Sequence, residues 1–131
     1  MDMTNQLLLV EDDALVQDML AEALGDAGFE VICASTGDAA IKALEDDAAR
    51  FSAVITDIRL GAGPDGWAVG RRARELAPDV PVVYMSGDST QDWSSRGVPN
   101  SVVAAKPFVP AQILTAVTML LNEAATRKAG S

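Results

Sequence analysis

Four short segments of the sequence carry the groups that could take part in chemistry. They are Glu11-Asp12-Asp13, Asp57, Ser86 and Lys106-Pro107. Each follows a short apolar run, which is typical of the point where a buried strand ends. The sequence contains no histidine, so the residue that most often acts as general base or metal ligand is missing. Any chemistry must therefore use carboxylates, hydroxyls, lysine or a metal held by oxygen atoms.

This combination of carboxylates with a lysine and a serine favours phosphoryl transfer. Carboxylates held close together repel one another, and a hard dication such as Mg²⁺ (or Mn²⁺) relieves that repulsion. A metal held by Asp12 and Asp57 could also neutralise an incoming phosphoryl group and orient it. Asp57 could then attack as a carboxylate nucleophile and form an acyl phosphate. Lys106 and Ser86 could hold the new phosphoryl oxygens.

Each group also has a simpler interpretation. Residues 11–13 could form a solvated loop whose last residue caps the following helix. Asp57 could be a turn residue, Ser86 could belong to a turn, and Lys106 could lie on the surface. The combination favours the chemical interpretation, because four separate strand ends supply complementary groups that one mechanism requires.

Five apolar runs predict the strands that position these groups. They are Leu7 to Val10, Val31 to Ala34, Ala53 to Thr56, Val82 to Met85, and Val102 to Ala105. The runs are continuous rather than alternating in polarity, as expected for parallel strands covered on both faces. Five strand-helix units in succession predict an α/β fold with a doubly wound, five-stranded parallel sheet. Ligand sites in such sheets lie beyond the carboxyl ends of the strands.

Helical patterns lie between the runs. The first is a stripe of seven apolar residues that starts after Asp13 and is stopped by Gly28; it contains Leu15, Val16, Met19, Leu20, Ala23, Leu24 and Ala27. Further stripes follow Thr36, end before Pro78, and run from Pro110 to Ala124. The pattern from Thr90 to Arg96 is short and polar, so we expect the fourth helix to be the least stable element.

Composition limits the function classes. At 131 residues the chain can form one domain with a core. Its net charge of -9 repels nucleic acid and anionic membranes, so we expect no direct binding to either. We see neither a membrane-spanning run nor a secretory signal and expect a cytoplasmic protein. Cys33 lies in an apolar run, which predicts a buried structural thiol.

The sequence resembles the receiver domain of bacterial two-component response regulators, a superfamily of CheY-like domains. The likeness extends from about Leu7 to Leu121. It rests on five motifs that occur in this order: Leu9-Val10-Glu11-Asp12-Asp13, Val54-Ile55-Thr56-Asp57, Asp65-Gly66, Tyr84-Met85-Ser86-Gly87 and Ala105-Lys106-Pro107-Phe108. Each motif is weak alone, and together they are specific.

The resemblance implies a flavodoxin-like sheet with strand order 2-1-3-4-5 and a role for each site residue. Asp57 is implied as the phosphoacceptor. The implied metal ligands are Glu11, Asp12, Asp57 and the backbone carbonyl of Arg59. Ser86 matches the hydroxyl that responds to phosphorylation, and Lys106 matches the phosphate-binding lysine, whose bond to Pro107 is cis in the family.

Two features depart from the family pattern. The aromatic switch residue that often lies three positions before the lysine is replaced here by Val103. The loop from Ile58 to Gly66 lacks the usual Met-Pro, is one residue longer and contains three glycines, so we expect it to be mobile. Both departures leave the residues of the expected acceptor chemistry in place. They indicate that the signal leaves the site by a different route from the usual one in the family.

The resemblance also predicts organisation and partners. We expect a receiver domain over residues 6–124, a polar tail over residues 125–131 and no output domain, although the chain could equally be a piece of a hybrid kinase. A histidine kinase or histidine phosphotransfer protein would supply the phosphoryl group. An output protein would bind the face made by the fourth helix, fifth strand and last helix. The chain would catalyse only its own phosphorylation and dephosphorylation and would not otherwise be an enzyme.

Three other functions fit the sequence less well. An aspartate-nucleophile phosphatase would need a second aspartate at the position of Arg59. A flavodoxin-type carrier of flavin mononucleotide would need a loop rich in Ser, Thr and Gly after the first strand, where this chain has three carboxylates. The third is a receiver-like module that no longer accepts phosphate, and the complete acceptor set argues against it.

One hypothesis concerns the lifetime of the phosphorylated state. Arg59 lies two residues after the acceptor, and Asp88 lies two residues after Ser86. Their charges are opposite and their strands are neighbours in the implied order. We therefore expect these side chains to pair across the entrance of the site and to modulate attack by water.

Overall fold

The computed structural model describes residues 5–87 and 90–129. A five-stranded parallel sheet forms its centre, with strand order β2-β1-β3-β4-β5. The strands are β1 (Gln6–Val10), β2 (Glu30–Ala34), β3 (Phe51–Asp57), β4 (Val82–Ser86) and β5 (Val102–Ala105). The predicted fold class and strand order are confirmed, and every predicted strand is present.

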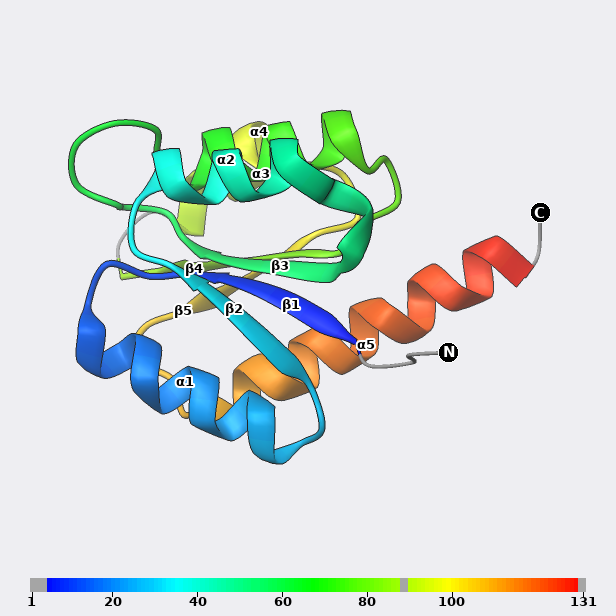
Figure 1. Ribbon diagram of the computed structural model, residues 1–131, viewed down its shortest axis with the longest axis horizontal. Coiled ribbons are helices and arrows are strands. Elements are labelled where there is room, and N and C mark those ends of the chain that lie inside the picture. Colours follow the sequence, from blue (N-terminus) through cyan, green and yellow to red (C-terminus); the bar gives the residue numbers. More distant parts are fainter. Residues whose placement is uncertain (1–4, 88–89, 130–131) are drawn as a thin grey trace.

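Helices cover both faces of the sheet (Figure 1). They are α1 (Ala14–Asp26), α2 (Gly37–Asp47), α3 (Gly66–Leu76), α4 (Trp93–Arg96) and α5 (Pro110–Ala129). Short 3₁₀ turns, η1 (Ala48–Arg50) and η2 (Thr90–Asp92), precede β3 and α4. The helices α1 and α5 lie on one face, while α2, α3 and α4 lie on the other. No helix in residues 5–87 and 90–129 is long and apolar enough to cross a membrane.

Two apolar layers hold these helices to the sheet. Alternate residues of a strand point to opposite faces, so Leu7 and Leu9 pack towards α1 and α5, while Leu8 and Val10 pack towards α2 and α3. All four are fully buried. Because both faces of the sheet are covered, its strands can be apolar throughout, which is the pattern that identified them.

The predicted apolar stripe of α1 is too broad. Leu20 and Leu24, four residues apart, are buried against the sheet, but Leu15 is 81% exposed and Met19 is 44% exposed. Each precedes by one position a residue that faces the sheet, and one position turns the side chain by about 100° around the helix axis. These two residues therefore lie on the flank of α1 and not in the core.

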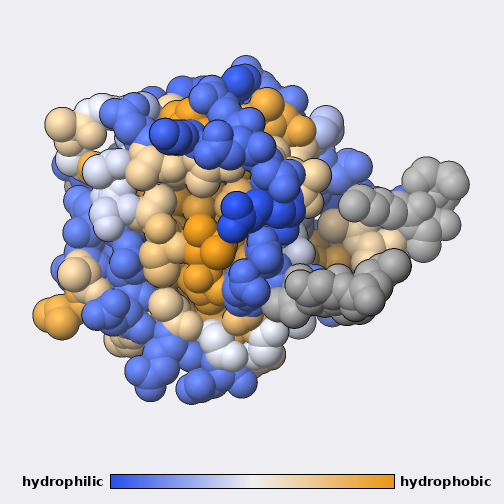
Figure 2. Space-filling model, in the orientation of Figure 1, coloured by the Kyte–Doolittle hydropathy of each residue, from blue (hydrophilic) through white to orange (hydrophobic). Residues whose placement is uncertain are grey.

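Two further expectations are wrong. Residues 125–129 are helical, because α5 continues to Ala129 instead of giving way to a tail after residue 124. Cys33 is exposed and not buried, because β2 is an edge strand. Figure 2 shows an apolar strip along this edge, between the polar outer surfaces of α1 and α2.

Candidate functional site

Four of the predicted groups meet at the carboxyl ends of β1, β3, β4 and β5. Neighbouring parallel strands end at the same edge of the sheet, which brings together residues far apart in sequence. Asp57 ends β3, Ser86 ends β4, and Lys106 follows β5. With Ile58, Arg59 and Gly87, these three residues line an open pocket of about 330 Å³. A larger groove lies at the other end of the strands, near the amino ends of β3 and β4 around Phe51 and Pro81, and is mainly apolar.

Glu11, Asp12 and Asp57 form an acidic cluster beside this pocket. Each offers a carboxylate oxygen, and these atoms all lie within 4.8 Å of one another. Glu11 and Asp57 are buried, with exposed fractions of 1% and 6%, whereas Asp12 is exposed. Asp13, the next residue, caps α1 by accepting hydrogen bonds from Leu15 and Val16, as expected.

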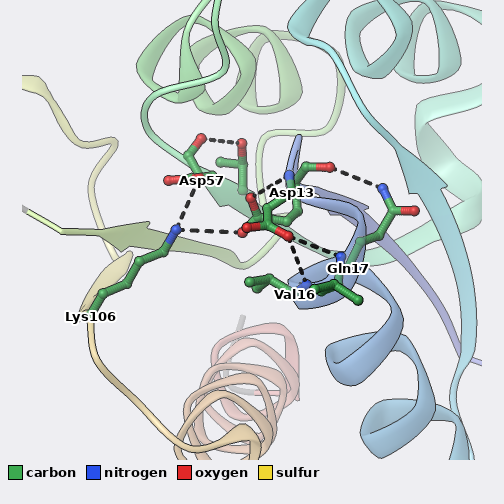
Figure 3. A network of polar contacts seen from close by, with 8 residues as sticks. Asp13, Val16, Gln17, Asp57 and Lys106 are labelled. Carbon is green, nitrogen blue, oxygen red and sulfur yellow. Dashed lines mark hydrogen bonds and ion pairs between the residues drawn. The ribbon is translucent and has the colours of Figure 1, made fainter.

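Lys106 neutralises part of this negative charge. Its Nζ donates a hydrogen bond to Asp57 Oδ2 at 3.1 Å and lies 3.6 Å from Glu11 Oε1. These contacts are drawn in Figure 3. Burial alone would lower the pKa of Lys106, but the hydrogen bond and charge of Asp57, together with the charge of Glu11, outweigh burial and raise this pKa. Lys106 therefore stays charged and keeps its hydrogen bond to the Asp57 carboxylate.

The two carboxylate oxygens of Glu11 differ in their hydrogen bonding. Glu11 Oε2 accepts a hydrogen bond from the Asp13 N–H at 3.1 Å. Glu11 Oε1 is, among the buried side-chain nitrogen and oxygen atoms of the described residues, the one without a hydrogen-bond partner. The pKa of Glu11 is raised to about 7. Burial is the main cause and the Asp57 charge contributes, while the hydrogen bond from the Asp13 N–H and the charge of Lys106 act in the opposite direction. An incompletely satisfied carboxylate beside two others fits a hard dication.

The loop after Asp57 is tied down at both ends. Ile58 and Leu60 are buried in the core, and the Gly66 N–H donates to the Ile58 carbonyl at 2.8 Å. A Cβ atom on Gly66 would lie 2.2 Å from the Asp57 carbonyl oxygen, so only glycine allows α3 to begin this close to the acceptor. The mobility expected for the loop from Ile58 to Gly66 stays a prediction.

The remaining predicted residues are placed as follows. The Lys106-Pro107 peptide bond is cis, as the resemblance implied. Arg59 is exposed at the pocket, and the role of its carbonyl as a metal ligand stays a prediction. Asp88 lies outside the described residues, so its pairing with Arg59 also stays a prediction. Val103 is half-buried on β5 and pairs in register with Tyr84 of β4.

Two residues at the site were missed in the sequence. Thr56 is fully buried, and its hydroxyl donates to the Asp57 carbonyl at 2.8 Å. The Gln17 side chain donates to the Glu11 carbonyl at 3.0 Å. Both act on backbone carbonyls, which no side-chain pattern reveals, and a glutamine near the surface of an amphipathic helix is ordinary.

Comparisons with known proteins converge on one family. The family model described as the response regulator receiver domain matches residues 7–118. A response regulator receiver protein of Anaeromyxobacter sp. is 35% identical over 116 residues, which cover 87% of this chain and 44% of the relative. The chain therefore spans less than half of that relative's length.

Solved structures agree. A response regulator receiver protein from Sinorhizobium medicae has a TM-score of 0.89 and 44% identity, covering 93% of this chain and 98% of that one. The receiver domain of a sensor histidine kinase from Pseudomonas aeruginosa has a TM-score of 0.77 and 25% identity, covering 91% and 98%. That domain was solved with a magnesium ion coordinated in its active site cleft.

The raised pKa of Glu11 predicts how stability depends on pH in metal-free protein. Because the folded state binds this proton more tightly, the stabilisation it provides is complete below pH 4.5 and is lost as pH rises through about 7. Glu11→Gln mimics the protonated form. We expect its melting temperature to exceed that of the wild type at pH 8.5 by at least roughly 3–6 °C, the shift that about 1 kcal/mol produces in a domain of this size, and by less at pH 5.5.

Thermal melts in a chelator between pH 5.5 and 8.5 measure this difference. Glu123→Gln removes one exposed charge from α5 and serves as the control, with no comparable rise. A difference between Glu11→Gln and wild type that stays constant across this range would contradict the prediction. Excess Mg²⁺ should reverse the order at pH 8.5, because Glu11→Gln removes one of the predicted carboxylate ligands and binding to the native state stabilises it.

Proposed function

Because the chain belongs to the response regulator receiver family, we propose that it is a phosphoacceptor switch of a two-component phosphorelay. The observation that carries the proposal is Lys106, which contacts the buried Asp57 at 3.1 Å and the neighbouring Glu11 at 3.6 Å. A nucleophile, a cation-binding set and an oxygen-binding ammonium thus share one pocket. Asp57 would receive the phosphoryl group from a histidine kinase or histidine phosphotransfer protein in the cytoplasm.

The proposed reaction uses this chain's own groups in fixed roles. A carboxylate oxygen of Asp57 attacks the phosphorus of the donor, the bond from phosphorus to the donor's leaving group breaks, and an aspartyl phosphate results. Lys106 and the Ser86 hydroxyl then bind the phosphoryl oxygens. Hydrolysis by water returns the Asp57 carboxylate and inorganic phosphate. The chain would act on no other substrate.

A divalent cation, Mg²⁺ or Mn²⁺, completes the proposed site. Glu11, Asp12 and Asp57 would hold it, with the Arg59 carbonyl as a further ligand. When bound, it would neutralise charge that builds up on the transferring phosphoryl group. The magnesium ion of the Pseudomonas aeruginosa receiver domain supports this choice, and so does the unsatisfied Glu11 Oε1.

The proposed output surface consists of α4, β5 and α5. Only four residues form α4, and side chains fasten it at both ends. Trp93 Nε1 donates to Ser101 Oγ at 2.9 Å. Arg96 lies 3.7 Å from Asp65, the N-cap of α3, and its guanidinium carbon lies 5.6 Å from the Trp67 ring centroid. Since Asp65 belongs to the loop that follows Asp57, a change at the acceptor can reach α4 without an aromatic residue at position 103.

Tyr84 supports the same region from beneath. Its ring packs on Trp67 with centroids 4.8 Å apart, and its hydroxyl accepts a hydrogen bond from the Val98 N–H at 3.2 Å. Tyr84 lies two residues before Ser86, so both side chains point to the same face of the sheet. With Val103 beside it in register, Tyr84 supplies an aromatic ring next to the position where the family often has one.

Phosphorylation tests the acceptor role directly. We expect one acid-labile phosphoryl group per chain after incubation with acetyl phosphate, and only when Mg²⁺ is present. Asp57→Asn should abolish labelling, because an amide is not a nucleophile here. Asp12→Ala should reduce it at limiting Mg²⁺, because one ligand is lost. Intact-mass spectrometry gives the result, and labelling of Asp57→Asn at the wild-type level would refute the proposal.

Hydrogen exchange tests the output surface. Beryllofluoride with Mg²⁺ mimics a bound phosphoryl group and should change exchange across residues 90–105. Few apolar contacts hold α4, so local opening costs little. Arg96→Ala should raise exchange in α4 severalfold even without the mimic, because it removes the contacts to Asp65 and Trp67.

Arg72→Ala is the matched control, because the ion pairs of Arg72 are with Glu45 of α2 and Glu75 of α3. Its exchange in residues 90–105 should equal that of the wild type. A response to the mimic confined to segments outside residues 90–105 would place the output surface elsewhere.

A further inference from the structure

The side-chain amide of Gln17 joins two loops at the edge of the acidic cluster. Gln17 lies in the second turn of α1, and its Nε2 donates to the Glu11 carbonyl at 3.0 Å. The same nitrogen lies 3.4 Å from Ser35 Oγ and 3.5 Å from the Ala34 carbonyl oxygen. Figure 3 shows the Gln17 side chain reaching back from α1 towards this loop. The loops that follow β1 and β2 therefore meet at one amide group.

Hydrogen bonds hold the backbone of Glu11 on both sides, and one of them comes from Gln17. The Glu11 N–H donates to the Ala34 carbonyl at 3.1 Å, while the Glu11 carbonyl accepts from Gln17. The first of these bonds extends the pairing of β1 with β2 by one residue beyond Val10 and Ala34. The second bond comes from the Gln17 side chain. It satisfies the Glu11 carbonyl at the point where β1 has ended and pairing with β2 no longer continues.

Fixing this backbone matters because the Glu11 side chain occupies an unfavourable place. Its carboxylate is buried, lacks a hydrogen bond at Oε1, and lies in a cluster with Asp12 and Asp57. The Asp13 N–H and Lys106 offset part of this cost through contacts of 3.1 and 3.6 Å to the carboxylate. The remaining burial and repulsion favour rotation of the loop that would carry the side chain into water. A cation binds best where such ligands are already in place, because the cost of ordering them has been met during folding.

We propose that Gln17 is a positioning residue for the divalent-cation site, holding the Glu11 backbone so that the buried carboxylate faces Asp12 and Asp57. The inference rests on the proposed metal-dependent acceptor function. Gln17 does not touch the cation. It acts through the Glu11 carbonyl, and its loss leaves the number and charge of the acidic ligands unchanged.

Two variants and one control isolate this role. Gln17→Met keeps the length of the side chain and removes the donor, and Gln17→Ala keeps good helix propensity in case methionine disturbs folding. Gln6→Met is the matched control. Gln6 also joins β1 to a neighbouring segment, since its side chain bonds Glu30 and Arg50, but it lies at the opposite end of β1.

Titration calorimetry with Mg²⁺ alone measures the dissociation constant, and initial rates of labelling by acetyl phosphate are measured against Mg²⁺ concentration. Loss of one neutral hydrogen bond of about 1 kcal/mol corresponds to roughly fivefold in affinity. We expect the dissociation constant and the half-saturating Mg²⁺ concentration to rise about three- to tenfold in both Gln17 variants. The labelling rate at saturating Mg²⁺ should stay within twofold of wild type, and Gln6→Met should bind normally.

The outcomes separate positioning from simple stabilisation. A purely structural role would lower the melting temperature of the Gln17 variants and leave the dissociation constant unchanged, which would overturn the inference. Equal weakening in Gln6→Met would also overturn it. Failure of the wild-type protein to bind Mg²⁺ would instead contradict the proposed function on which the inference rests.

Discussion

Crowding of like charge at the carboxyl end of the sheet is the constraint on which the site depends. Glu11, Asp12 and Asp57 bring carboxylate oxygens within 4.8 Å of one another, and two of these residues are buried. Lys106 offsets part of the repulsion through its contacts to Asp57 and Glu11. The sheet holds the carboxylates together against the remaining repulsion, because strands packed on both faces cannot move apart. The proposed binding of a cation and a phosphoryl group would make use of this prearranged charge.

A chain of close contacts connects the end of β3 at Asp57 with α4. Gly66 lets α3 begin against the Asp57 carbonyl, and Asp65 and Trp67 on either side of it contact Arg96 of α4. The short α4 has no extensive apolar face of its own, so these contacts set how firmly it is held. These contacts are the route by which the proposed signal would pass from the end of β3 to a short helix with few anchoring contacts.

Much of this could be predicted from sequence, and the exceptions have physical reasons. The buried strands appear as continuous apolar runs, and the residues that follow them, such as Asp57 and Lys106, must meet at one edge. The prediction of a buried Cys33 is wrong because it rested on the apolar run alone, although the strand order 2-1-3-4-5 implied by the resemblance already places this strand at an edge. Leu15 was misjudged because a wide stripe does not show which residues face the sheet. Gln17 and Thr56 escaped notice because they bind backbone carbonyls. Roles in metal binding and phosphoryl transfer rest on the residue types at the strand ends and on the family resemblance, and they stay proposals.

A crystal structure grown with Mg²⁺ and beryllofluoride tests most directly the claim that Asp57 accepts the phosphoryl group within this charged cluster. The account predicts beryllium bonded to an Asp57 carboxylate oxygen, Lys106 Nζ moved from that carboxylate to a fluorine, and the cation among Glu11, Asp12 and Asp57. An unmodified Asp57 that keeps its 3.1 Å contact with Lys106, with the mimic bound elsewhere or not at all, would contradict it.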